Sequence, residues 1–204
     1  MNLTDLSEME LDALREISGI GASHAATALS DLVGHLVRIE VPTIELLEIT
    51  DLPGVFGGPE QLVGAAFASL EGAIGGGILV MATPETIASI IEMLGETPAG
   101  GPGFPDERLA GILVDVVARR LFDSYLRAVA EMTGLESRAP SVGWAYDMAG
   151  ALLEAIVAEI GSRADHALLV RTAFIDRFRT VETAFFFVPD PDSLAVILSR
   201  LGLA

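Results

Sequence analysis

Residues 84–95 read PETIASIIEMLG, and residues 191–202 read PDSLAVILSRLG. The two stretches lie 107 positions apart and share proline, alanine, leucine and glycine at matching places. Each has proline in its first turn, apolar residues at helical spacing and a closing glycine, a pattern typical of an amphipathic helix. A helix that recurs at a fixed offset indicates an internally duplicated chain.

The segments before these two helices repeat as well. Four β-like runs are predicted at 62–70, 74–81, 167–175 and 180–188. An earlier strand is expected in each half, near 37–49 and near 141–146, and a helical insert at 148–160 belongs to the second half alone. Each half therefore has three predicted strands before its closing helix.

A long helix opens each half. The first is predicted from Glu8 to Val33, with Ser7 and Glu10 as a capping box at its start. The second is predicted from Asp106 to Thr133. Both are followed by glycine, the residue that most often ends a helix.

Together these elements predict an α+β fold. It is an internal duplication of helix–three strands–helix halves that share one mostly antiparallel sheet, with the long helices packed on it. We expect one domain over 1–204, with halves 1–97 and 104–204 joined by the proline- and glycine-rich linker 98–103. Either half alone is too small for a good core, so a shared sheet is favoured.

Composition narrows the functional class. The chain is 51% hydrophobic, yet it has no apolar run of the roughly 18 residues that a membrane span needs. Its acidic N-terminus does not resemble a secretory signal, so a cytoplasmic location is expected. With no cysteine and three scattered histidines, the sequence predicts neither a metal site nor a cofactor.

The charge balance is strongly acidic. The formal net charge is -17, and all 12 basic residues are arginine. This disfavours nucleic acids and anionic membrane surfaces as partners. We favour adaptation to high salt, with a salt-adapted archaeon as the expected source. An acidic surface built for a basic partner is the alternative.

The first long helix has two distinct faces. At about 100° per residue, Asp12, Glu16, Gly19 and Ser23 fall on one side, and small apolar residues fall on the opposite side. The apolar side suits packing on a sheet. From these residues alone, the polar side is interpreted as a solvated helix face.

Residues 14–29, LREISGIGASHAATAL, resemble the opening helix of the CheC/CheX/FliY family of chemotaxis phosphatases. The family pattern is Asp or Ser, three residues, Glu, two residues, Asn, then 22 residues and Pro. Asp12, Glu16 and Pro42 match it at the required spacing, and Gly19 stands at the Asn position. The stretch 133–150 is similar to the corresponding part of the CheC branch.

The resemblance implies a role in the chemotaxis phosphorelay. CheC-like proteins hydrolyse the aspartyl phosphate of the response regulator CheY. The family Glu pairs with a regulator lysine, and the family Asn orients the attacking water, which is catalysis by positioning. The CheC branch also binds CheD, a receptor deamidase, and Asp147 matches a region implicated in that contact. From the residues alone, Asp147 is interpreted as a cap for the following helix.

The chain departs from the family pattern in both halves. Gly19 has no side chain with which to hold water, and Ser18 points about 100° away from it. In the second half, the offset of 100 places Ile112, Val116 and Arg119 at the motif positions. Arg119 has aspartates at i−4 and i+4, which favours a surface ion-pair cluster. The two apolar residues are either a docking patch or part of a more buried helix.

These observations predict a CheC-type adaptor that binds CheD, phosphorylated CheY or both, with weak or absent phosphatase activity. Catalysis, if present, would depend on Glu16 and Asp12, and Asp147, Ile112, Val116 and Arg119 are the expected partner contacts. Two alternatives remain: an active CheY-P phosphatase that uses Glu16, and a motility switch component like FliM or FliY. The sequence leaves open whether the chain is an enzyme.

Overall fold

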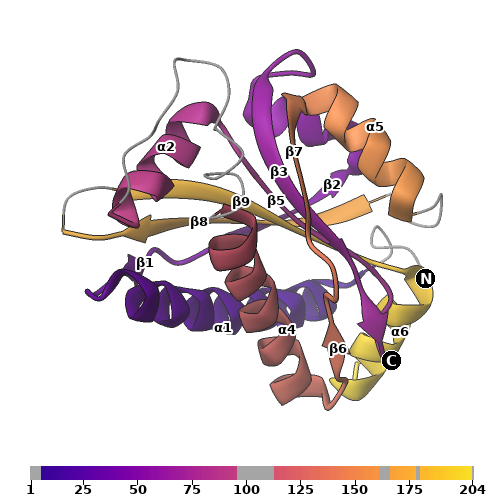
Figure 1. The fold of residues 1–204 in the computed structure, drawn as a ribbon. Helices are drawn as coiled ribbons and strands as arrows, with labels where there is room; N and C mark the ends of the chain where they lie inside the picture. Colours follow the sequence, from indigo (N-terminus) through magenta and orange to yellow (C-terminus); the bar gives the residue numbers. More distant parts are fainter. Residues whose placement is uncertain (1–5, 96–112, 161–165, 178–179, 204) are drawn as a thin grey trace.

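The computed structural model describes residues 6–95, 113–160, 166–177 and 180–203. These residues form a sheet of seven strands, a smaller sheet of two short strands, and helices on both faces of the larger sheet (Figure 1). Every strand pairing among them is antiparallel. The predicted α+β fold, with a mostly antiparallel sheet and long packed helices, is confirmed.

Helix α1, Glu8–Val33, has the bounds that the sequence predicts. The Ser7 backbone N–H donates to the Glu10 carboxylate over 2.7 Å, and the Glu10 backbone N–H donates to Ser7 Oγ over 3.4 Å, which completes the capping box. The pKa of Glu10 is lowered, mainly by the hydrogen bond from the Ser7 side chain and to a smaller extent by the one from the Ser7 backbone. Gly34 follows the helix with a left-handed φ of 71°.

The two halves complete each other's sheet. The strands of the large sheet are β1 (Arg38–Ile39), β2 (Thr43–Glu48), β3 (Leu62–Ser69), β5 (Gly76–Ala82), β7 (Gly143–Met148), β8 (His166–Ile175) and β9 (Thr180–Pro189). Their order is β1-β8-β9-β5-β3-β7, and β2 also pairs with β8. Thus β2 lies on a strand of the second half, and β7 lies on a strand of the first. At the centre, β5 pairs with β9, and Leu79 faces Phe186, 107 residues later.

Alternating side chains of the strands supply two cores. On one face, Phe185 and Phe187 of β9 pack with α1 and with α4 (Arg119–Thr133). On the other face, Phe186 and Val188 pack with α5 (Ala149–Ile160). Figure 1 shows α1 and α4 on one side of the sheet and α5 on the other. Helix α6 (Pro191–Arg200) extends the first core, and α2 (Pro84–Met93) covers a smaller cluster with Trp144.

Two local features differ from the sequence prediction. The strand expected near 37–49 is split into β1 and β2, and Pro42, which has no backbone N–H for a ladder, lies between them. Glu71 and Gly72, expected only to separate two strands, form the short strand β4, which pairs with β6 (Ser137–Arg138).

A helical insert was expected in the second half alone, but the first half contains one as well. Helix α5 matches the predicted helix at 148–160, but a 3-10 helix, η2 (Ile49–Phe56), occupies the corresponding place in the first half. With Pro53 and Gly54 inside it, η2 has no α-helical hydrophobic period that would predict it from sequence. The predicted linker 98–103 and the start of the helix predicted from Asp106 lie outside the described residues.

Candidate functional site

The outer face of α1 presents the motif carboxylates to solvent. Asp12 and Glu16 are both exposed, and Gly19, one turn beyond Glu16, is half-buried. The helix is held in this rotation because Leu14 and Ile17, on its other side, are 2% exposed and belong to the core against the sheet. The structure therefore brings the three motif positions of α1 onto one accessible surface.

Asp12 has a neighbour that the motif does not contain. The Arg15 guanidinium donates to the Asp12 carboxylate over 2.5 Å. The two side chains are 51% and 70% exposed, so solvent screens the pair and it contributes little to stability. Such an ion pair is easily exchanged for a partner's charge. The i, i+3 spacing on a helix was the available sequence signal for it.

The position of the family Asn is open space. A Cβ built on Gly19 meets no heavy atom within 4 Å, other than its chain neighbours and the local helix backbone. A side chain would fit there without displacing anything. Gly19 has no side chain, so it cannot hydrogen-bond a water molecule beside Glu16.

Ser18 is unable to replace the missing group. Its side chain is fully buried, its hydroxyl donates to the Leu14 carbonyl over 2.8 Å, and it shares a 3.2 Å hydrogen bond with the Tyr125 hydroxyl. Desolvation by burial raises the pKa of Tyr125 well above its usual range, so the phenol stays protonated. Ser18 therefore ties α1 to α4 and faces away from the solvent-exposed carboxylates.

A close contact between helices sets the position of α1 against α4. Gly21 packs directly on Tyr125: a Cβ at Gly21 would lie 2.8 Å from Tyr125 Cδ2 and 3.2 Å from its Cα. The Tyr125 ring also packs against Phe185 and Phe187, with centroids 4.7 Å and 5.2 Å away. The missing side chain at Gly21 thus allows the approach that fixes which residues of α1 face outward.

The second half presents a different surface at the matching positions. Val116 is half-buried in a π-helical stretch, η3 (Leu113–Ala118), which leads directly into α4. Arg119, the first residue of α4, is also half-buried. Ile112 lies outside the described residues, so the apolar patch expected from Ile112 and Val116 stays a prediction.

Asp147 lies on a free edge of the sheet. Strand β7 is the last strand of the sheet order, and β3 is its only strand partner among the described residues. Asp147 is exposed, and its carboxylate accepts a 2.8 Å hydrogen bond from the Met148 backbone N–H just before α5. Met148 and its cross-strand partner Leu62 are 45% and 38% exposed. We call Leu62, Asp147 and Met148 the β7 edge patch.

The carboxylates of α1 and the β7 edge patch are separate surfaces. Helix α1 covers one face of the sheet, and β7 forms its edge. Pro42, the last motif position, is half-buried between β1 and β2. Within the described part of the chain, no group of three or more His, Asp or Glu residues is placed to hold a metal ion. No helix in that part is long and apolar enough to span a membrane.

Comparison with known proteins finds similarity to CheC proteins. The sequence model of the CheC-like family matches residues 9–46, which include Asp12, Glu16, Gly19 and Pro42. The chain is 28% identical over 200 residues to the CheY-P phosphatase CheC of Bacillus subtilis, which covers 97% of this chain and 96% of that protein.

FliY proteins are similar in sequence and in fold. The flagellar motor switch phosphatase FliY of Bacillus subtilis is 38% identical over 77 residues, which are 38% of this chain and 20% of that protein. The crystal structure of Thermotoga maritima FliY matches with a TM-score of 0.75 at 15% identity, over 97% of this chain and 98% of that one. The chain is thus related to the CheC and FliY class of chemotaxis proteins and to CheY-P phosphatases.

Proposed function

We propose that this chain is a CheC-type signalling adaptor that binds CheD, a phosphorylated CheY-type regulator, or both, and hydrolyses the regulator's phosphate weakly or not at all. The observation that carries the proposal is the open space at Gly19. Hydrolysis needs a water oriented in line with the phosphorus atom and the aspartyl oxygen that leaves. With Gly19 bare and Ser18 buried against Tyr125, α1 offers no side chain for that water one turn beyond Glu16.

Docking of the regulator is supported by what α1 retains. Glu16 is exposed and matches the family residue that pairs with a regulator lysine. Asp12 lies beside it, and its pair with Arg15 is weak enough to be exchanged. Carboxylates of this kind set the orientation and the rate of encounter with a basic surface. They favour binding without supplying hydrolysis.

Binding of CheD is supported by the β7 edge patch. Asp147 matches the region implicated by resemblance in CheD contact, and Leu62 and Met148 add exposed apolar surface on the other face of the same strand edge. A partner strand added at this edge would contact side chains on both faces of β7. The strand edge also leaves backbone groups of β7 available for pairing.

The two partners are expected to respond to different substitutions. With the immobilised chain, Asp147→Ala is expected to weaken CheD binding about tenfold and to leave the regulator unaffected. Glu16→Ala is expected to weaken binding of the phosphorylated regulator to a similar extent and to leave CheD unaffected. Titration of each purified partner over each variant measures both effects.

Asp192→Ala is the matched control, because Asp192 is an exposed acid in the first turn of α6. It changes the net charge equally and is expected to alter neither affinity. Wild-type chain that binds neither CheD nor the regulator would refute the adaptor proposal. Equal losses for both partners in all three variants would assign the effect to net charge alone.

Two other functions have specific support. Glu16 and Asp12 keep the exposure that an active phosphatase needs, and a relative over nearly the whole chain is named as a CheY-P phosphatase. A role in a motility switch is supported by the FliY similarity, in sequence and in fold. The cytoplasmic location and the salt-adapted archaeal source stay predictions. The prediction of the source rests only on the acidic, lysine-free composition.

A further inference from the structure

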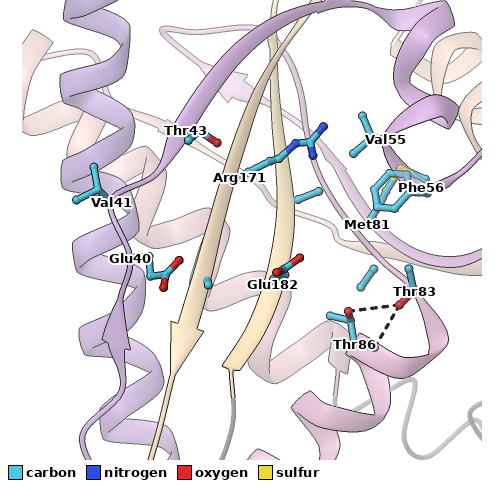
Figure 2. Close-up of a pocket in the computed structure, with 13 residues that line it drawn as sticks. Glu40, Val41, Thr43, Val55, Phe56, Met81, Thr83, Thr86, Arg171 and Glu182 are labelled. Carbon is cyan, nitrogen blue, oxygen red and sulfur yellow. Dashed lines mark hydrogen bonds between the residues drawn. The ribbon is translucent and has the colours of Figure 1, made fainter.

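A hollow of about 350 Å³ opens on the face of the sheet opposite to α1. Figure 2 shows its lining side chains, which come from β2, β5, β8, β9, η2, the start of α2 and the segment between β1 and β2. Its volume is in the range of small-molecule sites, which are usually about 300 to 1,000 Å³. Neither the α1 carboxylates nor the β7 edge patch contributes to it.

The hollow arises from the unequal inserts of the two halves. Helix α5 has 12 residues and buries Leu152, Leu153 and Ile156 on this face. Its counterpart η2 has 8 residues and buries only Leu52. The sheet beside η2 is therefore less covered, and the small side chains of Ala173 and Ala184 on the strands leave space above them.

Opposite charges line the hollow on neighbouring strands. Arg171 of β8 faces Ala184 across the ladder, and Glu182 of β9 faces Ala173, so the two charged residues are diagonal neighbours on one face. Figure 2 shows the Arg171 guanidinium and the Glu182 carboxylate at separate positions on this surface. Among the described residues, the ion-pair contact of Arg171 runs from its Nε to Glu45 Oε1 and is 3.8 Å long, beyond hydrogen-bonding distance. Guanidinium N–H groups therefore remain for a ligand.

The rest of the lining adds a second carboxylate, hydroxyl groups and an apolar wall. In Figure 2, Glu40 lies level with Glu182 and across β8 from it. Thr83 and Thr86 share a hydrogen bond of 3.4 Å between their hydroxyls at the rim. Phe56, whose ring centroid is 6.2 Å from that of Phe186, contributes the apolar wall with Val55 and Met81.

We propose that this hollow binds a small zwitterion with an apolar side chain, the chemical class of the free hydrophobic amino acids. Arg171 pairs with the ligand carboxylate, for which its planar fork is suited. Glu182, supported by the charge of Glu40, receives the ammonium group, and the ligand side chain packs on Phe56. A zwitterion places one charge opposite Arg171 and one opposite Glu182, whereas a cation alone or an anion alone matches only one of these two side chains.

Three probes of one shape test the requirement for both charges. They are L-phenylalanine, phenethylamine, which lacks the carboxylate, and 3-phenylpropionate, which lacks the ammonium group. Titration calorimetry, with L-leucine as a second zwitterion, is expected to show binding of both amino acids. Each single-charge probe is expected to bind at least about tenfold more weakly than L-phenylalanine, because it loses one charge-assisted pair.

Variants assign the binding to this hollow. Arg171→Ala should make the affinity for L-phenylalanine equal to that for phenethylamine. Glu182→Gln should make the affinity for L-phenylalanine equal to that for 3-phenylpropionate. Arg138→Ala and Glu71→Gln are matched controls, because Arg138 and Glu71 form an exposed 3.2 Å ion pair on the small sheet. Neither control should change the affinities.

Three results would overturn the proposal. They are no binding of either amino acid at millimolar concentration, equal binding of phenethylamine and L-phenylalanine, or affinities that the Arg171 and Glu182 variants leave unchanged. Ala184→Leu, which fills the hollow and leaves its charges in place, should abolish binding as well. Circular dichroism of each variant separates a lost site from a lost fold.

Discussion

Replacing Gly19 with asparagine is expected to accelerate dephosphorylation of a phosphorylated CheY-type regulator about 10- to 100-fold over the wild-type chain. The new side chain would extend from the same helix face as Glu16, into space where its Cβ meets no heavy atom within 4 Å. Its amide would hold the attacking water while Glu16 keeps the regulator docked. Helix stability is expected to rise slightly, because asparagine is a better helix former than glycine.

Two further variants separate positioning from simple filling. Gly19→Ala occupies the same space without an amide and is expected to leave the rate at the wild-type level. Glu16→Ala in the Gly19→Asn background is expected to remove the gain. The rates are measured from the decay of radiolabelled regulator phosphate under single-turnover conditions. A Gly19→Asn variant that folds, binds the regulator and hydrolyses no faster would show that more than the water-positioning group is missing.

Replacing Gly21 with alanine is expected to lower the free energy of unfolding by about 1–3 kcal/mol, the usual range for overpacking in a core. The added methyl group would lie 2.8 Å from Tyr125 Cδ2 and 3.2 Å from Tyr125 Cα. The tyrosine has little room to move, because its ring packs on Phe185 and Phe187 and its hydroxyl is bonded to Ser18. The strain therefore falls on the contact between α1 and α4.

Gly19→Ala provides the matched control for stability, two residues earlier on the same helix. It meets open space and is expected to raise the free energy of unfolding by up to about 1 kcal/mol, through helix propensity alone. Urea denaturation of both variants measures the difference. Equal effects of the two substitutions would contradict the close approach of α1 and α4 at Gly21.

Local signals made much of the fold predictable from sequence. Ser7, Glu10 and Gly34 defined both ends of α1, because capping groups act within one helical turn. The repeated helices and strands predicted that both halves contribute strands to one sheet, since each half shows the same hydrophobic pattern. Helix η2 escaped prediction because a short 3-10 helix that contains Pro53 has no α-helical period. Strand β4 escaped because two residues are too few for a periodic pattern.

The candidate site was predictable only where it is local to one helix. Helical spacing put Asp12 and Glu16 on one surface, and both are exposed. The burial of Ser18 depends on Tyr125, more than 100 residues away in the sequence, and no pattern within α1 reveals it. The hollow near Arg171 likewise depends on strand register between distant segments and on the shortness of η2. Contacts of this kind come from tertiary packing.

The central claim is that the surface around Glu16 docks a regulator without holding a hydrolytic water. Its most direct test is the decay rate of a phosphorylated cognate regulator, measured alone, with the wild-type chain and with Glu16→Ala, at protein concentrations that saturate binding. We predict that the wild-type chain and Glu16→Ala both leave the decay close to the regulator's own rate. A faster decay with the wild-type chain that returns to the regulator's own rate with Glu16→Ala would contradict the claim.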